Sequence, residues 1–279
     1  MFSKFSYTWE LMGASWNVLK RDKHLLFFPL LSGICCLFVI ASFVAPAVTF
    51  GLHHRHAQTQ DSRVLYYFLL FAFYFANYFV ITFFNVAITS FAISRMAGGE
   101  PTFAGALREA IKHIHLIAGW ALFSATVGMV LRILSERSGF IGKIVVSVLG
   151  AAWTIMAFLV VPILVIEDKG PFQALKTSMS LITKTWGERV VGNFSFGLVF
   201  FALTIPAIIA IIFGITLAAS ATPLLGFMII GTAVVYIIVL SLVHSALLSI
   251  FQAAIYMYTQ GVTDPQRGFP VQLLRSAMQ

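Results

Sequence analysis

Six apolar segments, each long enough to cross a lipid bilayer, constrain this chain more than any other feature of its sequence. Of the 279 residues, 59% are hydrophobic and only 10% are charged, against about 25% charged residues in a soluble domain. A bilayer offers no water to backbone N–H and C=O groups, so apolar segments of this length must form helices. We therefore expect an all-α integral membrane protein with six transmembrane helices, over residues 25–52, 64–94, 116–134, 144–166, 190–219 and 226–258.

A basic amphipathic segment precedes each pair of apolar segments. The clearest one begins at Pro171 and carries Lys176 and Lys184 on its polar face. Its apolar face repeats at steps of three and four residues: Phe172, Leu175, Met179, Ile182 and Trp186. Weaker copies lie near residues 5–20 and 101–115. Because such helices lie flat in the headgroup layer, we expect one membrane domain built of three parallel units, each an amphipathic helix on the cytoplasmic surface followed by a transmembrane hairpin. The units are residues 1–94, 95–166 and 167–262, with a cytoplasmic tail at 263–279.

The distribution of basic residues orients the chain. Thirteen of its 18 lysines and arginines lie on the side that holds both termini, and five lie on the other side. The positive-inside rule therefore places both termini in the cytoplasm. The net charge of +8 is scattered over short loops, so we expect anionic lipid headgroups, and no nucleic acid, as its counter-charge. The residues expected to contact lipid or a protein partner at this face are Lys112, Lys176, Lys184 and Trp186.

Two of the predicted helices carry a polar face inside the membrane. The second helix places four such residues within one sector: Tyr74, Asn77, Thr82 and Asn85. The sixth carries Ser241, His244 and Gln252. One interpretation is a path for a solute, ion or lipid headgroup with His244 as a titratable gate. The other is hydrogen bonding between helices that fixes the bundle. No Asp or Glu falls inside a predicted transmembrane helix, so coupling to protons or sodium through a carboxylate lacks its usual residue.

A search for catalytic and metal-binding patterns leaves one weak candidate. The imidazoles of His53, His54 and His56 suit zinc, copper or nickel. However, structural zinc normally takes four ligands, and no Cys or acid lies within a few residues of the three histidines. A solvated loop is the simpler interpretation. We find no nucleophile with a base, no paired carboxylates and no phosphate-binding loop, and we therefore expect no enzymatic activity and no cofactor.

Short motifs near both ends of the chain resemble a known group of sequences. They comprise Ala246, Leu247, Phe251, Ala253, Ala254, Ile255, Tyr256, Tyr258, Gly261 and Phe269, with Trp16, Leu26, Phe27, Phe28, Pro29 and Leu30. This pattern resembles an uncharacterised family of bacterial six-span inner-membrane proteins. The alternation of flat helix and hairpin is more distantly similar to the membrane domain beside glycerophosphodiester phosphodiesterases and to Yip-like proteins. The resemblance implies a multi-pass protein of the bacterial inner membrane and supplies no catalytic residue, since the phosphodiesterase domain itself is absent.

These observations lead to two hypotheses of different classes. The first is a non-enzymatic channel- or transporter-like bundle for a small solute, ion or lipid. We expect it to form a homo-oligomer, because Ser241, Ser245 and Ser249 make a ladder of small residues that allows helices to approach closely. The second is a membrane scaffold or assembly factor whose cytoplasmic amphipathic helices recruit partners or shape the bilayer.

Overall fold

The computed structural model describes residues 13, 15–53, 60–186, 195–219 and 222–260, and this part of the chain is helical without any strand. Its elements are the 3-10 turn η1 (Lys23–Leu26) and helices α2 (Phe27–His53), α3 (Gln60–Met96), α4 (Phe103–Lys112), α5 (Ile114–Arg137), α6 (Phe140–Met156), α7 (Val160–Ile166), α8 (Pro171–Trp186), α9 (Ser195–Ala218) and α10 (Pro223–Thr259). Six helical stretches are long and apolar enough to cross a membrane. The expectation of an all-α chain with six such helices is confirmed.

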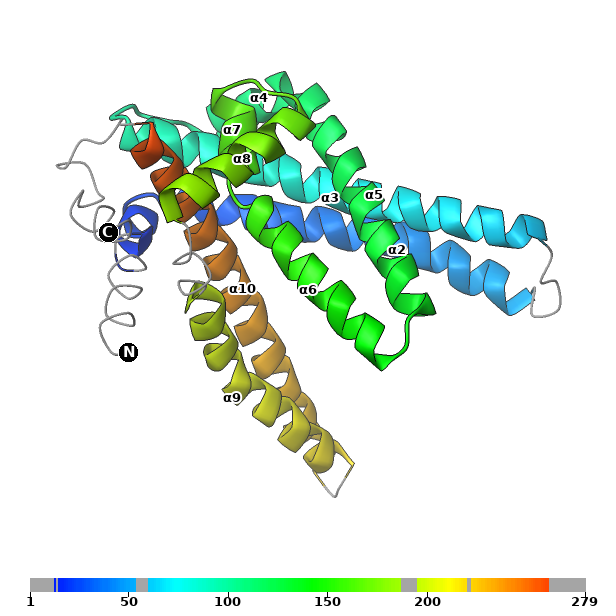
Figure 1. Ribbon diagram of the computed structural model, residues 1–279. Coiled ribbons are helices and arrows are strands. Elements are labelled where there is room, and N and C mark those ends of the chain that lie inside the picture. Colours follow the sequence, from blue (N-terminus) through cyan, green and yellow to red (C-terminus); the bar gives the residue numbers. More distant parts are fainter. Residues whose placement is uncertain (1–12, 14, 54–59, 187–194, 220–221, 261–279) are drawn as a thin grey trace.

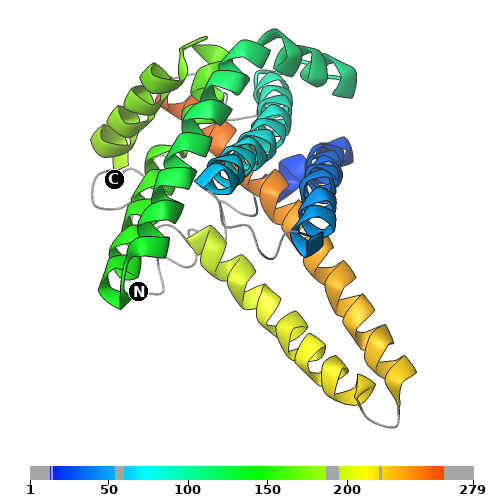
Figure 2. The same ribbon diagram turned by 90° about the vertical axis from the view of Figure 1, so that its right-hand side faces the viewer.

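The long helices pair into three hairpins, α2 with α3, α5 with α6, and α9 with α10. The hairpins meet at the end of the molecule where α4, α7 and α8 lie, and they diverge toward the opposite end (Figure 1). The view turned by 90° shows the same divergence, with α9 and α10 leaning away from the other helices (Figure 2). Helix α3 is central, because it packs against α2, α4, α5, α7 and α10.

The hydrophobic core occupies the end at which the hairpins meet. Its fully buried side chains come from every hairpin and include Phe28, Ile88, Ile117, Ile163, Ile250 and Tyr256. The ring of Phe28 stacks on Phe103 of α4 with centroids 4.6 Å apart. Toward the diverging ends, large apolar side chains such as Phe38, Phe68 and Phe140 are exposed. Such a surface suits contact with lipid tails, which are as apolar as the side chains themselves.

The fourth transmembrane segment is not one continuous helix, in contrast to the segment expected over residues 144–166. It is divided into α6 and α7 by a turn at residues 157–159. Pro162 causes the division, because it has no N–H to donate to Phe158 and its ring obstructs a continuing helix. In the structure Pro162 lies in the first turn of α7, where a backbone N–H would have no helical partner in any case.

Helix α8 packs against the protein through a face different from the apolar face that its sequence indicates. Ala174, Ser178 and Ile182 are buried, whereas Phe172 and Met179 are exposed. Of the expected apolar face, Leu175 and Ile182 therefore pack against the protein, and Phe172 and Met179 remain free to contact lipid. The side chains of Lys184 and Trp186 lie outside the described part of the structure.

Several expectations fall on residues outside the described part. Most of the first amphipathic segment does so, because residues 1–12 and 14 are not described, and so does the tail at 263–279. His54 and His56 also lie outside it, as does the side chain of His53, so the weak metal candidate remains a prediction. Within the described residues, no three His, Cys, Asp or Glu side chains lie close enough together to hold a metal ion.

Two glycines of α10 allow a matched test of helix packing. A Cβ atom on Gly226 would lie 2.5 Å from the carbonyl oxygen of Gly214 on α9, whereas one on Gly231 would meet nothing within 4 Å. We expect Gly226→Ala to destabilise the protein by about 1–3 kcal/mol through overpacking against backbone. Gly231→Ala should be neutral or slightly stabilising, because Ala favours helix. Thermal unfolding of the purified variants in detergent measures both, and equal melting temperatures would contradict the close approach of α9 and α10.

Candidate functional site

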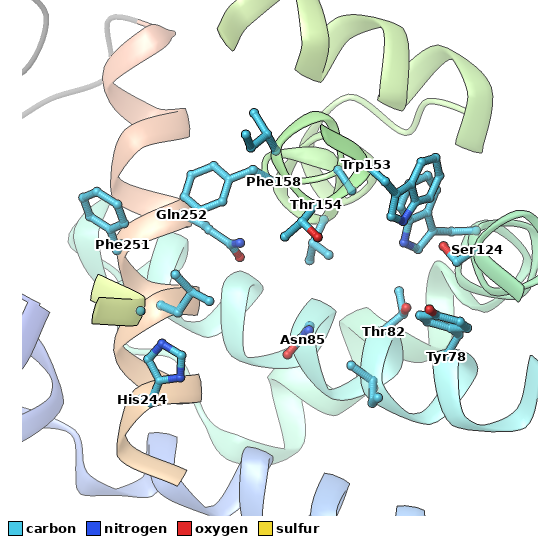
Figure 3. Close-up of a pocket in the computed structure, with 17 residues that line it drawn as sticks. Tyr78, Thr82, Asn85, Ser124, Trp153, Thr154, Phe158, His244, Phe251 and Gln252 are labelled. Carbon is cyan, nitrogen blue, oxygen red and sulfur yellow. The ribbon is translucent and has the colours of Figure 1, made fainter. Parts of the chain in front are cut away.

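A cavity of about 500 Å³ lies among the transmembrane helices, next to the buried end of the bundle. Residues of α3, α5, α6, α7 and α10, with Gly197 of α9, line it. Its size falls within the range of small-molecule sites, about 300–1,000 Å³. Figure 3 shows it as the open space between α3 on one side and α6 and α10 on the other.

Helical spacing places the polar lining residues. Tyr78, Thr82 and Asn85 follow one another on α3 at steps of four and three, so they share one face. His244 and Gln252 lie two turns apart on α10 and face the same cavity. The side chains of Gln252 and Asn85 point into the same central space (Figure 3).

Aromatic rings form much of the remaining wall. Trp120 of α5 stacks on Trp153 of α6, with ring centroids 5.6 Å apart and ring planes 11° from parallel. Phe158 in the turn after α6 meets Phe251 of α10 edge-on at 6.2 Å. These flat apolar surfaces can pack against a ligand, while the amides and hydroxyl groups opposite them can orient it.

The polar groups of the cavity are largely without protein partners. Within the described residues, the side chains of Asn85, His244 and Gln252 make no hydrogen bond. The contact made by His244 is with the ring of Phe200, at a centroid distance of 4.5 Å. None of the lining residues that the structure describes is an Asp, Glu, Lys or Arg. Since unpaired amides at membrane depth are costly, the cavity is suited to hold water or a hydrogen-bonding ligand.

A serine from α8 supports the aromatic wall at the division between α6 and α7. The Ser178 hydroxyl donates to the carbonyl of Met156 at 2.7 Å and accepts from the N–H of Leu159 at 3.2 Å. The neighbouring N–H groups of Ala157, Phe158 and Val160 are satisfied by backbone carbonyls. Ser178 thus provides a partner for the remaining N–H of the turn, and it fixes the backbone from which Phe158 enters the cavity wall.

Two polar contacts tie helices together at the end beyond the cavity. The Arg95 guanidinium donates to both carboxylate oxygens of Asp22, at 2.7 and 2.5 Å, and so joins α3 to the turn before α2. The Tyr256 hydroxyl donates to Glu167 at 2.7 Å, and Lys169 pairs with the same carboxylate. Charge-assisted bonds of this kind are the strong ones. The first holds the end of α3 beside the turn before α2, and the second holds the end of α10 beside the end of α7.

The structure brings together four of the seven predicted intramembrane polar residues, Thr82, Asn85, His244 and Gln252. The other three lie elsewhere. Asn77 donates its amide to the carbonyl of Phe73 in its own helix, at 2.9 Å. The Tyr74 hydroxyl accepts from Arg132 of α5 at 3.4 Å. Ser241 is exposed.

Of the expected surface lysines, Lys112 pairs with Glu109 at 2.7 Å and Lys176 is exposed.

Sequence reasoning missed the contribution of α5 and α6 to the cavity. Trp120 and Ser124 lie one turn apart on α5, and Trp153 and Thr154 are adjacent on α6. The spacing of Trp120 and Ser124 is a signal of a shared face. Tryptophan in a transmembrane segment is usually placed in an interfacial belt, so the stacking of two indoles inside the bundle has no signature in either helix alone.

A comparison with known protein families matches residues 64–267 to a family of unknown function, DUF6159. The chain belongs to this family. No curated protein and no solved structure matches it, and the similarity to the membrane domain beside glycerophosphodiester phosphodiesterases and to Yip-like proteins finds no support. In this DUF6159 protein the matched segment contains every lining residue of the cavity, from Tyr78 to Gln252.

The Ser178 bridge can be tested by its removal. Ser178→Ala leaves the N–H of Leu159 and one acceptor site on Met156 unpaired in a buried turn, and we expect a loss of about 1–3 kcal/mol. Ser180→Ala is the matched control on the same helix, because no hydrogen bond of its hydroxyl stabilises the turn. Thermal unfolding in detergent measures both variants. An equal, small effect of the two substitutions would show that the turn does not depend on Ser178.

Proposed function

We propose that this DUF6159 member is a non-enzymatic, channel- or transporter-like protein that takes a small solute, ion or lipid into the cavity between α3, α5, α6 and α10. One observation carries the proposal: the unpartnered amides of Asn85 and Gln252 face one cavity of about 500 Å³ within transmembrane segments. Polar side chains in such a position are expensive, and they commonly mark a path or a binding site.

The lining supports an uncharged passenger more than an ion. Among the described residues that line it, the polar groups are amides, hydroxyls and one imidazole, with no carboxylate, Lys or Arg. A cation would lack a counter-charge in the membrane interior, as would an anion. An uncharged molecule with hydrogen-bonding groups can be bound by Asn85, His244 and Gln252 without that cost.

The proposed setting is the bacterial inner membrane, with both termini and helices α4 and α8 at the cytoplasmic face. The clustering of Arg95, Lys112, Lys169 and Lys176 near the end where α4 and α8 lie supports this orientation. The order of elements supports the proposed three-unit plan, because α4 precedes the α5–α6 hairpin and α8 precedes the α9–α10 hairpin. Anionic lipid headgroups are the proposed counter-charge at this face.

A homo-oligomer is part of the proposal. Helix α9 packs mainly against α10, and its large side chains Phe201, Ile209 and Phe213 are exposed. A second copy of the chain could cover this surface, as could lipid. Native mass spectrometry of the purified protein separates the two, because it reads the subunit number directly.

A scaffold or assembly factor is the second candidate function, supported by α8. This helix exposes Phe172 and Met179 together with the basic Lys176. Apolar and basic side chains on one helix favour binding to an anionic bilayer or to a protein partner at the membrane surface. In this case Lys176→Glu combined with Lys184→Glu should release the partner or weaken binding to anionic vesicles.

Transport through the cavity is tested in liposomes that hold the purified protein, with three probes: an uncharged solute, an ion whose entry a trapped ion-sensitive dye reports, and a fluorescent lipid. We expect at least one of the three to cross faster than in protein-free liposomes. His244→Ala and Asn85→Leu should each change that rate about tenfold, a difference of about 1.4 kcal/mol. Asn77→Leu is the matched control, because its amide bonds to its own helix and lies outside the cavity. No movement of any of the three with folded protein would contradict passage and favour the scaffold.

The proposed orientation is tested by labelling single cysteines after Cys35 and Cys36 have been replaced by alanine. A membrane-impermeant maleimide should label Lys112→Cys and Lys176→Cys only after the cells are permeabilised. Arg137→Cys, at the end of α5 next to the turn that leads to α6, should be labelled in intact cells. Labelling of either lysine position from outside would overturn the cytoplasmic placement of α4 and α8.

A further inference from the structure

The cavity is closed on the side of α8. The edge contact of Phe158 with Phe251 lies between the cavity and α8. The nearby side chains of Leu159, Val160 and Tyr256 are almost completely buried. Ser178, also fully buried, fills the space between the turn and α8. A water-soluble molecule would have to cross this packed layer to arrive from the end where α4 and α8 lie.

The cavity is open on another side, between α6 and the α9–α10 hairpin. Helix α6 packs mainly against α5 and α8, and α9 packs mainly against α10. Within the described residues, the α5–α6 and α9–α10 hairpins therefore share little interface, and they diverge (Figures 1 and 2). The lining residues that they contribute, Thr154 of α6 and Gly197 of α9, are exposed. Thr154 lies near the middle of the fourth transmembrane segment, Phe140–Ile166. The opening therefore faces the interior of the bilayer.

The depth of the polar groups limits the chemistry of a ligand. A helix rises 1.5 Å per residue. Gln252 therefore lies about 7.5 Å along α10 from Met257, where the sixth transmembrane segment ends. Asn85 lies about 16.5 Å along α3 from Met96, where the second transmembrane segment ends. A charged headgroup drawn to this depth would need a counter-charge, and the described lining residues offer none. A hydroxyl-bearing headgroup needs only donors and acceptors, which the two amides and the imidazole of His244 provide.

We propose that the ligand of this cavity is a membrane lipid with an uncharged, hydroxyl-bearing headgroup, of the diacylglycerol class, which enters from the bilayer between α6 and the α9–α10 hairpin. The inference rests on the proposed function, and it names the class of molecule that the site takes. In this assignment the headgroup occupies the space into which the side chains of Asn85 and Gln252 point (Figure 3), against the stacked rings of Trp120 and Trp153. The acyl chains extend through the opening beside Thr154 into the bilayer, so only the polar end of the lipid leaves the hydrocarbon.

Native mass spectrometry of the full chain in detergent tests this assignment with three probes: dioctanoylglycerol, phosphatidylglycerol with the same chains, and glycerol. We expect saturable binding of one dioctanoylglycerol per chain, and at least tenfold weaker binding of the other two. Asn85→Leu with Gln252→Leu should weaken dioctanoylglycerol binding at least tenfold. Asn77→Leu should leave it unchanged, because that amide lies outside the cavity.

A second variant keeps the test decisive if the double substitution fails to fold. Thr154→Phe places a bulky ring at the opening, at an exposed position whose hydroxyl bonds only to Gly150 of its own helix. We expect it to slow dioctanoylglycerol binding several-fold while the melting temperature stays the same. Equal binding of phosphatidylglycerol, or dioctanoylglycerol binding that neither variant affects, would overturn the inference. Binding of glycerol without either lipid would overturn the lipid class and leave the proposed function standing. If none of the three probes binds and nothing is transported in liposomes, the lipid assignment and the proposed function are both wrong.

Discussion

The structure depends on one requirement, that every backbone polar group at membrane depth finds a partner within the protein. Continuous helices meet this requirement along most of the transmembrane segments. The turn at residues 157–159 is an exception, because Pro162 ends the regular pattern. Ser178 meets the requirement there by donating to Met156 and accepting from Leu159. The side chain of a helix outside the bundle therefore completes the backbone of a helix inside it.

The Ser178 bridge connects the surface helix α8 to the wall of the cavity. Helix α8 is amphipathic and exposes Phe172 and Met179, so it is the element most suited to meet the bilayer surface. The turn that it supports carries Phe158 into the wall of the cavity. The core and the Asp22–Arg95 and Glu167–Tyr256 contacts hold this end of the bundle together. Toward the opposite ends, Arg132 of α5 donates to the Tyr74 hydroxyl of α3 at 3.4 Å, whereas α6 packs mainly against α5 and α8. This arrangement allows the cavity to open between α6 and the α9–α10 hairpin.

Those properties that depend on one helix at a time could be predicted from the sequence. Length and hydropathy indicate the six transmembrane segments, and spacing at 100° per residue places Thr82 and Asn85 on one face of α3. Properties that depend on two helices could not be predicted in this way. The partner of the α6–α7 turn lies on α8, and nothing in the local pattern at Pro162 points to it. Asn77 shares a helical sector with Asn85, but it bonds to Phe73 and lies outside the cavity. The choice between these two asparagines is made by the helices that pack against α3.

The distance in sequence between Ser178 and its partners has a consequence for biosynthesis. Leu159 and Met156 precede Ser178 by 19 and 22 residues, and a chain is made from its N-terminus onward. While the nascent chain is being inserted, the partner that the N–H of Leu159 has in the structure is not available until residue 178 has been added. The fourth crossing of the bilayer therefore reaches its final form only after α8 has been synthesised and has folded back onto it.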